Sequence, residues 1–200
     1  LPGIARAVGR QDDQEAGHLM YQAVWLVLLL ALFGDLILCF PGWLIAFAEL
    51  PPHVEALTRT YLFILACSLP ASLGYRAFHA IAGGMGKTRP LMWLSLGQTT
   101  GHALLAPVLV DSVLIGSVSL GLGLGVAGAA LSQALLAWLI CGAGVLVLLK
   151  SAVYRPLRVA ARFAPPDPAA LRHLLRVGLP MGLSYFVEIT AFTQIGRAHV

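Results

Sequence analysis

Residues 21–48 read YQAVWLVLLLALFGDLILCFPGWLIAFA, an apolar run whose single charged side chain is Asp35. A helix needs about 20 mostly apolar residues to cross a bilayer core of about 30 Å, and this run is long enough. Three more runs of this kind follow, and a fifth begins near Arg176. The sequence therefore predicts an all-α fold, a polytopic transmembrane helix bundle with spans at about residues 21–48, 61–82, 91–110 and 124–149.

The composition also indicates a membrane protein. Hydrophobic residues make up 58% of the chain and charged residues 11%, whereas a soluble domain has about 25% charged residues. The net charge is +4, but the basic residues occupy short connections and form no patch on a soluble domain, so nucleic acid is not an expected partner. Cys39, Cys67 and Cys141 are odd in number and far apart, which favours neither disulfides nor a metal site.

The distribution of Lys and Arg predicts the orientation in the membrane, because positive residues accumulate in cytoplasmic connections. If the segment before residue 21 is cytoplasmic, the opposite side holds only Arg59. Most Trp and Tyr residues fall near the span ends, where aromatic rings suit the membrane interface, but Trp138 does not. The cytoplasmic side then holds eleven basic residues: Arg6, Arg10, Arg76, Lys87, Arg89, Lys150, Arg155, Arg158, Arg162, Arg172 and Arg176.

Three parts of the chain are expected. Residues 1–164 carry the helices of a first bundle, and residues 165–193 carry an interfacial helix and the start of a second bundle. Leucines and basic residues at helical spacing in residues 165–176 predict a short helix on the cytoplasmic surface, with a solvated linker as the alternative. Residues 194–200 end in IGRAHV, which resembles a translated sequencing adaptor, so we expect a truncated reading frame.

Two nucleotide-binding motifs are incomplete. Gly86-Lys87-Thr88 resembles the end of a P-loop. The first glycine of that motif would fall at residue 81, which is Ile81. Residues 123–128, GLGVAG, match a dinucleotide fingerprint, and the preceding residues 112–122 resemble a strand. No acidic residue follows about 20 positions later, as ribose binding requires. Close helix packing through small residues, including the Gly121 and Gly125 pair, explains this segment better.

Glu188 lies within the last apolar run and is the main candidate for function. A carboxylate in hydrocarbon costs roughly 2.5–3.5 kcal/mol, and intramembrane acids commonly bind ions or protons. Ser184 and Tyr185 precede it by four and three residues, so they share its helix face. We predict a cation or proton site at Glu188, Ser184 and Tyr185, with a structural, hydrogen-bonded acid as the alternative.

A polar stripe marks the third run, where Ser95, Gln98, Thr99 and His102 repeat on one helix face. These side chains are expected to line a substrate cavity or to bond to neighbouring helices. Asp35 in the first run is a second candidate for cation binding, or it pairs with a polar group of another helix.

Three motifs resemble one family. They are VGLPMGLS at residues 177–184 followed by Glu188, AGGMGKTRPLM at residues 82–92, and GVAGAA at residues 125–130. Together they are similar to the multidrug and toxic compound extrusion (MATE) family, in particular its NorM-type bacterial members. The resemblance extends from Arg6 to about residue 193.

This resemblance implies twelve helices in two six-helix bundles, of which this chain covers the end of helix 2 to the start of helix 7. It implies a transporter of the bacterial cytoplasmic membrane, monomeric when full length, that exports organic cations in exchange for Na⁺ or H⁺. Glu188 falls on the family's helix 7 acid, which takes part in cation binding. The chain departs from the family at His102 and Ala106, where members commonly have two asparagines.

The function expected is thus a secondary multidrug antiporter, in which Glu188 binds H⁺ or transported Na⁺ in exclusion of a cationic drug. No enzyme activity, cofactor or resident metal is expected. A related flippase for lipid-linked oligosaccharides is one alternative, although it should have more Arg and Lys facing a cavity than these spans contain. A membrane scaffold without transport, or a truncated chain with no activity of its own, are the others.

Overall fold

The computed structural model describes residues 2–42, 45–46, 51–110, 113–115, 118–120, 122–155 and 165–198. Helices dominate these residues, which confirms the all-α membrane bundle. A hairpin of two three-residue strands is the exception. The elements are α1 (Pro2–Gly9), α2 (Asp13–Cys39), α4 (Pro52–Gly84), α5 (Thr88–Val110), β1 (Val113–Ile115), β2 (Val118–Leu120), α6 (Gly125–Lys150), a 3₁₀ turn (Ala152–Tyr154) and α8 (Pro168–Ala198).

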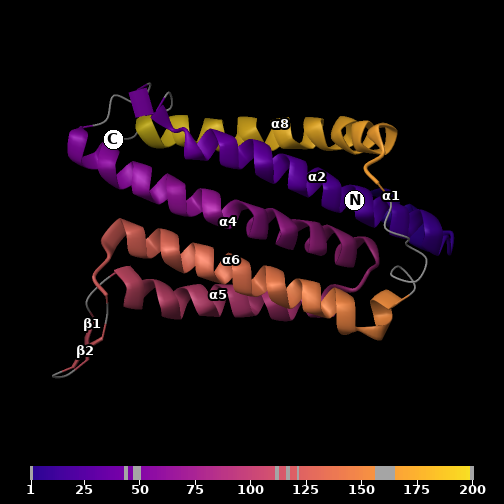
Figure 1. Ribbon diagram of the computed structural model, residues 1–200, viewed down its shortest axis with the longest axis horizontal. Helices are drawn as coiled ribbons and strands as arrows, with labels where there is room; N and C mark the ends of the chain where they lie inside the picture. Colours follow the sequence, from indigo (N-terminus) through magenta and orange to yellow (C-terminus); the bar gives the residue numbers. More distant parts are fainter. Residues whose placement is uncertain are drawn as a thin grey trace.

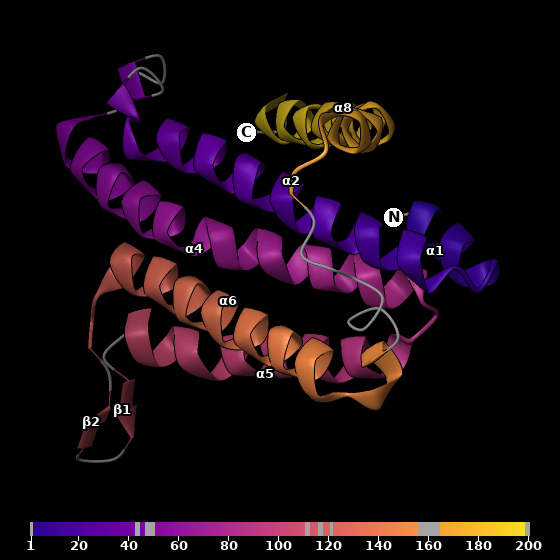
Figure 2. The ribbon, with the colours of Figure 1, turned by 45° about the vertical axis from the view of Figure 1, so that its right-hand side comes forward.

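The long helices follow one another in space in the order α8, α2, α4, α6, α5 (Figure 1). Helix α4 is central, because it packs against both α2 and α6, and α6 in turn packs against α5. Figure 2 shows α8 almost end-on while the other four helices run across the view, so α8 crosses α2 steeply. Residues 168–198 form one continuous helix, so no break separates the predicted surface helix from the last span, and the position of the first part on the membrane surface stays a prediction.

Three of the helices described, α2, α4 and α6, are long and apolar enough to cross a membrane by length and composition. Many large apolar side chains on them are exposed; Leu32 is 70% and Phe33 is 64% exposed. Apolar surface of this extent is typical of a protein that faces lipid. The chain is an integral membrane protein. Helix α5 is not among the three, because its polar stripe lowers its hydropathy.

Helix α2 differs from the first predicted span at both ends. It begins at Asp13, where the side chain of Asp12 accepts a hydrogen bond from the Glu15 amide at 2.9 Å. It ends at Cys39, two residues before Pro41, which has no amide hydrogen and disfavours a helical residue before it. A pattern of apolar residues does not show that the helix ends before Pro41, and so the predicted span continues to residue 48. Residues 43–44 and 47–50 lie outside the described part.

One end of the bundle holds α1, the turn between α4 and α5, and the end of α6 (Figure 1). Lys87, Arg89 and Lys150 lie there, as the predicted orientation requires. A buried cluster closes the same end and includes Ile4, Phe78, Ala82, Leu91 and Tyr154. Arg158 and Arg162, which the sequence assigns to the same side, lie outside the described residues.

Tyr154 is 1% exposed, and its ring meets Phe78 edge-on at 6.4 Å between centroids. The Tyr154 hydroxyl is buried and has no hydrogen-bond partner among the residues that the structure describes. Burial raises the pKa of Tyr154, because the phenolate form would lose its hydration. The side chain therefore acts as neutral packing at this end of the bundle.

Pro70 lies inside α4, where it cannot donate the usual helical hydrogen bond and disturbs the carbonyls one turn earlier. The indole Nε1 of Trp138 on α6 donates to one of these, the Cys67 carbonyl oxygen, at 3.1 Å. Membrane helices tolerate proline when a neighbouring helix satisfies the backbone groups it disturbs. This bond explains why Trp138 lies far from the predicted interfacial aromatic residues.

The hairpin of β1 and β2 follows the end of α5, with Val113 opposite Leu120 and Ile115 opposite Val118. The chain then returns to α5, where the amide of Leu122 donates to the carbonyl of Val108 at 3.0 Å. The last carbonyls of a helix have no partner within it, so this return satisfies one of them. Within the strand-like segment 112–122, residues 113–115 and 118–120 thus form a hairpin between α5 and α6.

The two nucleotide-like motifs are both at helix ends. Gly86 has φ +69° just after α4, where the Lys87 amide donates to the Ala82 carbonyl at 2.9 Å, a Schellman C-cap. In the other motif, Gly125 has φ +54° at the start of α6, and a Cβ atom added there would meet nothing within 4 Å. The described residues thus show Gly125 in a turn and show no close packing there, and Gly121, the other glycine of the predicted pair, lies outside them. Gly128 is the glycine that permits close packing, against the end of α5.

Candidate functional site

Helix α8 carries the predicted cation site, and its first turn explains where it starts. Asp167 caps it: the carboxylate oxygen Oδ1 accepts a hydrogen bond from the Ala169 amide at 2.9 Å. The Asp167 carbonyl accepts one from the Leu171 amide, also at 2.9 Å. Pro168 follows the cap, at the position where a missing amide hydrogen costs no helical bond. The sequence D-P therefore specifies the start of this helix.

Gln22 on α2 attaches the start of α8 to the bundle. Its side chain is fully buried. The amide nitrogen Nε2 donates to the Pro165 carbonyl at 3.0 Å, and the oxygen Oε1 accepts from the Asp167 amide at 2.9 Å. His18, one turn earlier, lies 3.9 Å from the Asp167 carboxylate. One buried glutamine thus satisfies two backbone groups of the segment that leads into α8.

Gln22→Leu should destabilise this junction, because the two partly buried hydrogen bonds to the Pro165 carbonyl and the Asp167 amide would be lost. The expected cost is about 1–3 kcal/mol of unfolding free energy, with faster hydrogen exchange at the Asp167 amide. Gln14→Leu on the exposed face of α2 is the matched control and should change neither quantity. Hydrogen exchange measured by mass spectrometry on the purified protein checks this. Equal exchange in the two variants would contradict the role given to Gln22.

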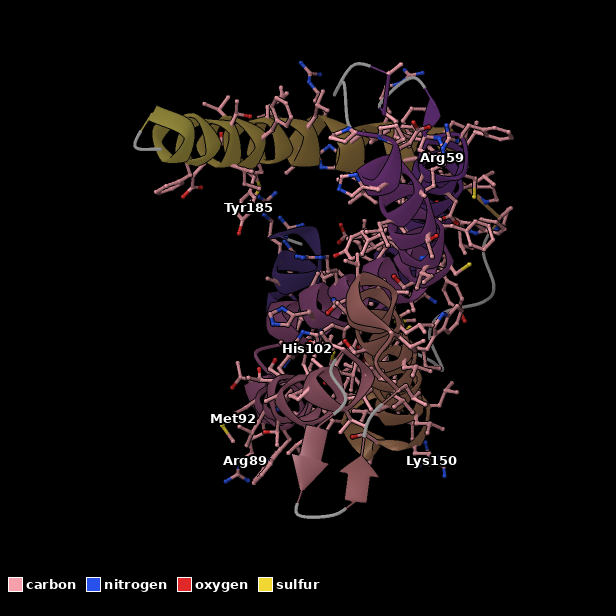
Figure 3. All side chains as sticks on the ribbon, turned by 90° about the vertical axis from the view of Figure 1, so that its left-hand side faces the viewer. Arg59, Arg89, Met92, His102, Lys150 and Tyr185 are labelled. Carbon is pink, nitrogen blue, oxygen red and sulfur yellow. The ribbon has the colours of Figure 1, made fainter. Side chains whose placement is uncertain are left out.

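The three α8 residues of the predicted cation site are exposed in the structure. The Ser184 hydroxyl donates to the Pro180 carbonyl at 3.0 Å in its own helix, so its proton is not directed to Glu188. Tyr185 extends from α8 in Figure 3 and is 68% exposed. Within the described residues, no hydrogen bond or ion pair holds the Glu188 carboxylate. Ion binding at this face stays a prediction.

Asp35, the second predicted cation ligand, is half-buried on α2. Its oxygen Oδ1 is inaccessible to solvent and has no hydrogen-bond partner among the described residues. The preceding Gly34 lies where α2 and α4 approach closely, against the side chain of Leu69. The structure therefore shows a carboxylate oxygen without a ligand at this helix contact, and its role in cation binding stays a prediction.

The polar stripe of α5 divides into two parts. Ser95 and Gln98 line a cavity of about 420 Å³ between α4, α5 and α6. The hydroxyls of Ser95 and Tyr75 lie 3.1 Å apart and share a hydrogen bond across the cavity wall. Thr99 and His102 are exposed and are not among its lining residues. The first half of the stripe thus lies at a cavity, and Ser95 also bonds to a neighbouring helix, so binding of substrate by the stripe stays a prediction.

Sequence reasoning missed the contribution of α4 to this cavity. Ser72, Tyr75, Arg76 and His79 line it together from one face of the helix. Their spacing of three and four residues is a signal that identifies such a face. The sequence assigns Arg76 only to the cytoplasmic side. It also disfavours a flippase, because few basic residues of the spans are expected to face a cavity. The structure provides one such arginine.

The structure does not bring the two predicted sites together. Helix α8, with Glu188, and helix α5, with the polar stripe, lie at opposite ends of the series of helices, with α2, α4 and α6 between them (Figure 1). Figure 3 shows the same separation for Tyr185 and His102. The residues of α8 and those of the α5 cavity therefore form two candidate sites.

Comparison with known proteins decides the family. The family model MatE matches residues 2–108, which include α1, α2, α4 and most of α5. The chain belongs to the MatE family. The resemblance inferred from the three motifs is thereby confirmed.

Relatives of this MatE chain match it along nearly all its length. It is 39% identical over 197 residues to a probable multidrug resistance protein NorM of Aromatoleum aromaticum, covering 97% of this chain and 41% of that protein. A probable multidrug resistance protein NorM of Neisseria meningitidis is 29% identical over 199 residues, with the same coverage. The multidrug resistance protein PmpM of Pseudomonas aeruginosa is 27% identical, covering 96% of this chain and 39% of that protein. The chain thus spans about two fifths of the curated relatives that it matches.

Proposed function

We propose that this MatE chain is part of a secondary multidrug efflux antiporter that exchanges organic cations for H⁺ or Na⁺. The match over 97% of the chain to a protein named as a probable multidrug resistance protein carries this proposal. The three helices long and apolar enough to cross a membrane support it. The proposed location is the bacterial cytoplasmic membrane, because the relatives come from bacteria. The full-length protein is proposed to act there as a monomer and to have no enzyme activity.

Glu188 is the residue proposed to couple the two fluxes, with Ser184 and Tyr185 beside it and Asp35 as a second acid. A carboxylate in an apolar helix is costly unless a proton or a cation neutralises it. One carboxylate cannot hold a proton or Na⁺ and a cationic drug at once, so each ligand weakens the affinity for the other. Such competition is reciprocal, and an inward ion gradient then drives the drug outward.

Everted membrane vesicles that contain the full-length protein test this proposal. A cationic dye such as ethidium should accumulate in them when an acid-inside pH gradient or an outward-directed Na⁺ gradient is imposed. Accumulation should stop when an ionophore removes the driving gradient, because the exchange has no other energy source. Vesicles from cells without the gene are the control. Dye accumulation that requires ATP and ignores both gradients would rule out antiport.

A further inference from the structure

We propose that the cavity between α4, α5 and α6 binds an anionic group, a phosphate or a carboxylate, carried by an amphiphilic molecule. The proposal rests on the side chains that line the cavity. It does not depend on the proposed efflux function, and Glu188 has no part in it.

The position of Arg76 is the first observation that supports the proposal. It lies in the body of α4, eight residues before the helix ends at Gly84, or about 12 Å along the helix axis. An arginine at such a position in a membrane helix is costly, so it normally faces an aqueous cavity or a counter-ion. Arg76 lines the cavity. Among the described residues it has no carboxylate partner, since the ion pairs found there join His18 to Asp167 and Arg59 to Glu55.

The other polar groups of the cavity include several hydrogen-bond donors. His79 lies beside Arg76 on α4, while Gln98 of α5 and Gln133 of α6 contribute side-chain amides from the other two walls. No aspartate or glutamate is among the described residues that line the cavity. A guanidinium group surrounded by neutral donors matches the oxygens of a phosphate or carboxylate, which arginine binds through two parallel hydrogen bonds. An organic cation would instead be repelled.

The remaining wall is apolar and indicates what else the ligand carries. Ala137 and Ile140 of α6 are buried at the cavity and offer no polar group. The hydroxyls of Tyr75 on α4 and Ser95 on α5, 3.1 Å apart, share a hydrogen bond that orients these two side chains in the cavity wall. The volume of about 420 Å³ lies within the range of about 300–1,000 Å³ that small-molecule sites occupy. The chemistry therefore fits an anionic head on an apolar body.

Binding of dansyl-undecanoate, a fluorescent carboxylate amphiphile, to the full-length protein in a neutral detergent tests the proposal. Arg76→Gln should weaken this binding about tenfold or more, because a hydrogen bond to a charged group contributes about 1.5–3 kcal/mol. Arg59→Gln is the matched control, since Arg59 lies on the same helix but pairs with Glu55 outside the cavity, and it should leave the affinity unchanged. Displacement of the dye by dioleoylphosphatidylglycerol but not by dioleoylglycerol, which has no phosphate, would identify a lipid phosphate as an occupant. Displacement by neither lipid would identify a carboxylate.

Two results would overturn the proposal: equal affinities in the two arginine variants, or no saturable binding by the wild-type protein. If Arg76→Gln does not fold, Gln133→Leu removes a donor without changing the charge and should weaken binding about fivefold. An unchanged affinity in that variant would equally refute the site. Dye efflux by the Glu188 pathway is measured separately, so failure of either proposal can be recognised on its own.

Discussion

Glu188→Gln should abolish the proposed drug efflux by the full-length protein, lowering the resistance of the cells to that of cells without the gene. Glutamine has nearly the shape of glutamate but cannot take up a proton or neutralise a cation, so the proposed exchange would lose the site that both ligands are proposed to share. Ethidium efflux from a drug-sensitive host, together with growth inhibition by cationic drugs, measures the effect. The amount of protein in the membrane must match that of the wild type.

Glu55→Gln is the control for this substitution. Glu55 is also a glutamate on a long helix, but it pairs with Arg59 at 2.8 Å in the first turns of α4. A surface ion pair of this kind contributes about 0–1 kcal/mol, so efflux should remain at the wild-type level. Unchanged efflux in the Glu188 variant would remove the main support for the coupling mechanism. Loss in both variants would point to a general defect in folding or insertion.

Gly128→Ala should destabilise the bundle by about 2 kcal/mol, the usual scale for overpacking a tight contact. A Cβ atom at this position would overlap the backbone of α5, with the carbonyl carbon of Leu109 only 2.6 Å away. Backbone atoms cannot move aside as the end of a flexible side chain can, so α5 and α6 must separate. Thermal unfolding of the purified protein in detergent measures the loss.

Gly142→Ala on the same helix should have the opposite sign. Nothing lies within 4 Å of a Cβ atom at Gly142. Alanine also favours a helix interior by about 1 kcal/mol over glycine. The unfolding temperature should therefore rise slightly in this variant and fall clearly in Gly128→Ala. A fall of equal size in both would mean that the contact at Leu109 is not tight.

The sequence predicts the bounds of two helices, α5 and α6, closely. Helices α5 and α6 begin and end within three residues of the predicted spans, because a segment in lipid must satisfy its backbone hydrogen bonds internally. Helix α4 is predicted less well, since it begins at Pro52 instead of residue 61. Its first turns are polar and are stabilised by the Glu55–Arg59 pair, which a hydropathy pattern does not register.

The candidate sites also depend partly on local spacing, which the sequence shows, and partly on helix packing, which it does not. The spacing of Ser95 and Gln98 is sufficient to place them on one face, because 3.6 residues per turn relate neighbours on a helix. That this face meets Arg76 and His79 of α4 depends on how the helices pack, which no local pattern specifies. Gln22 is a similar case. Its partners Pro165 and Asp167 lie 143 and 145 residues further along the chain, and only the fold brings them together.

The sequence by itself thus determined the class of protein, its helices and, through the three motifs, its family. Each of these depends on local composition or spacing, which a membrane restricts strongly. The tertiary structure alone decided which helices are neighbours, where α8 attaches, and that a cavity lined by Arg76 lies between α4, α5 and α6. These features depend on contacts between distant residues, and their geometry is set by side-chain packing at positions such as Gly128, where the available space decides how closely two helices approach.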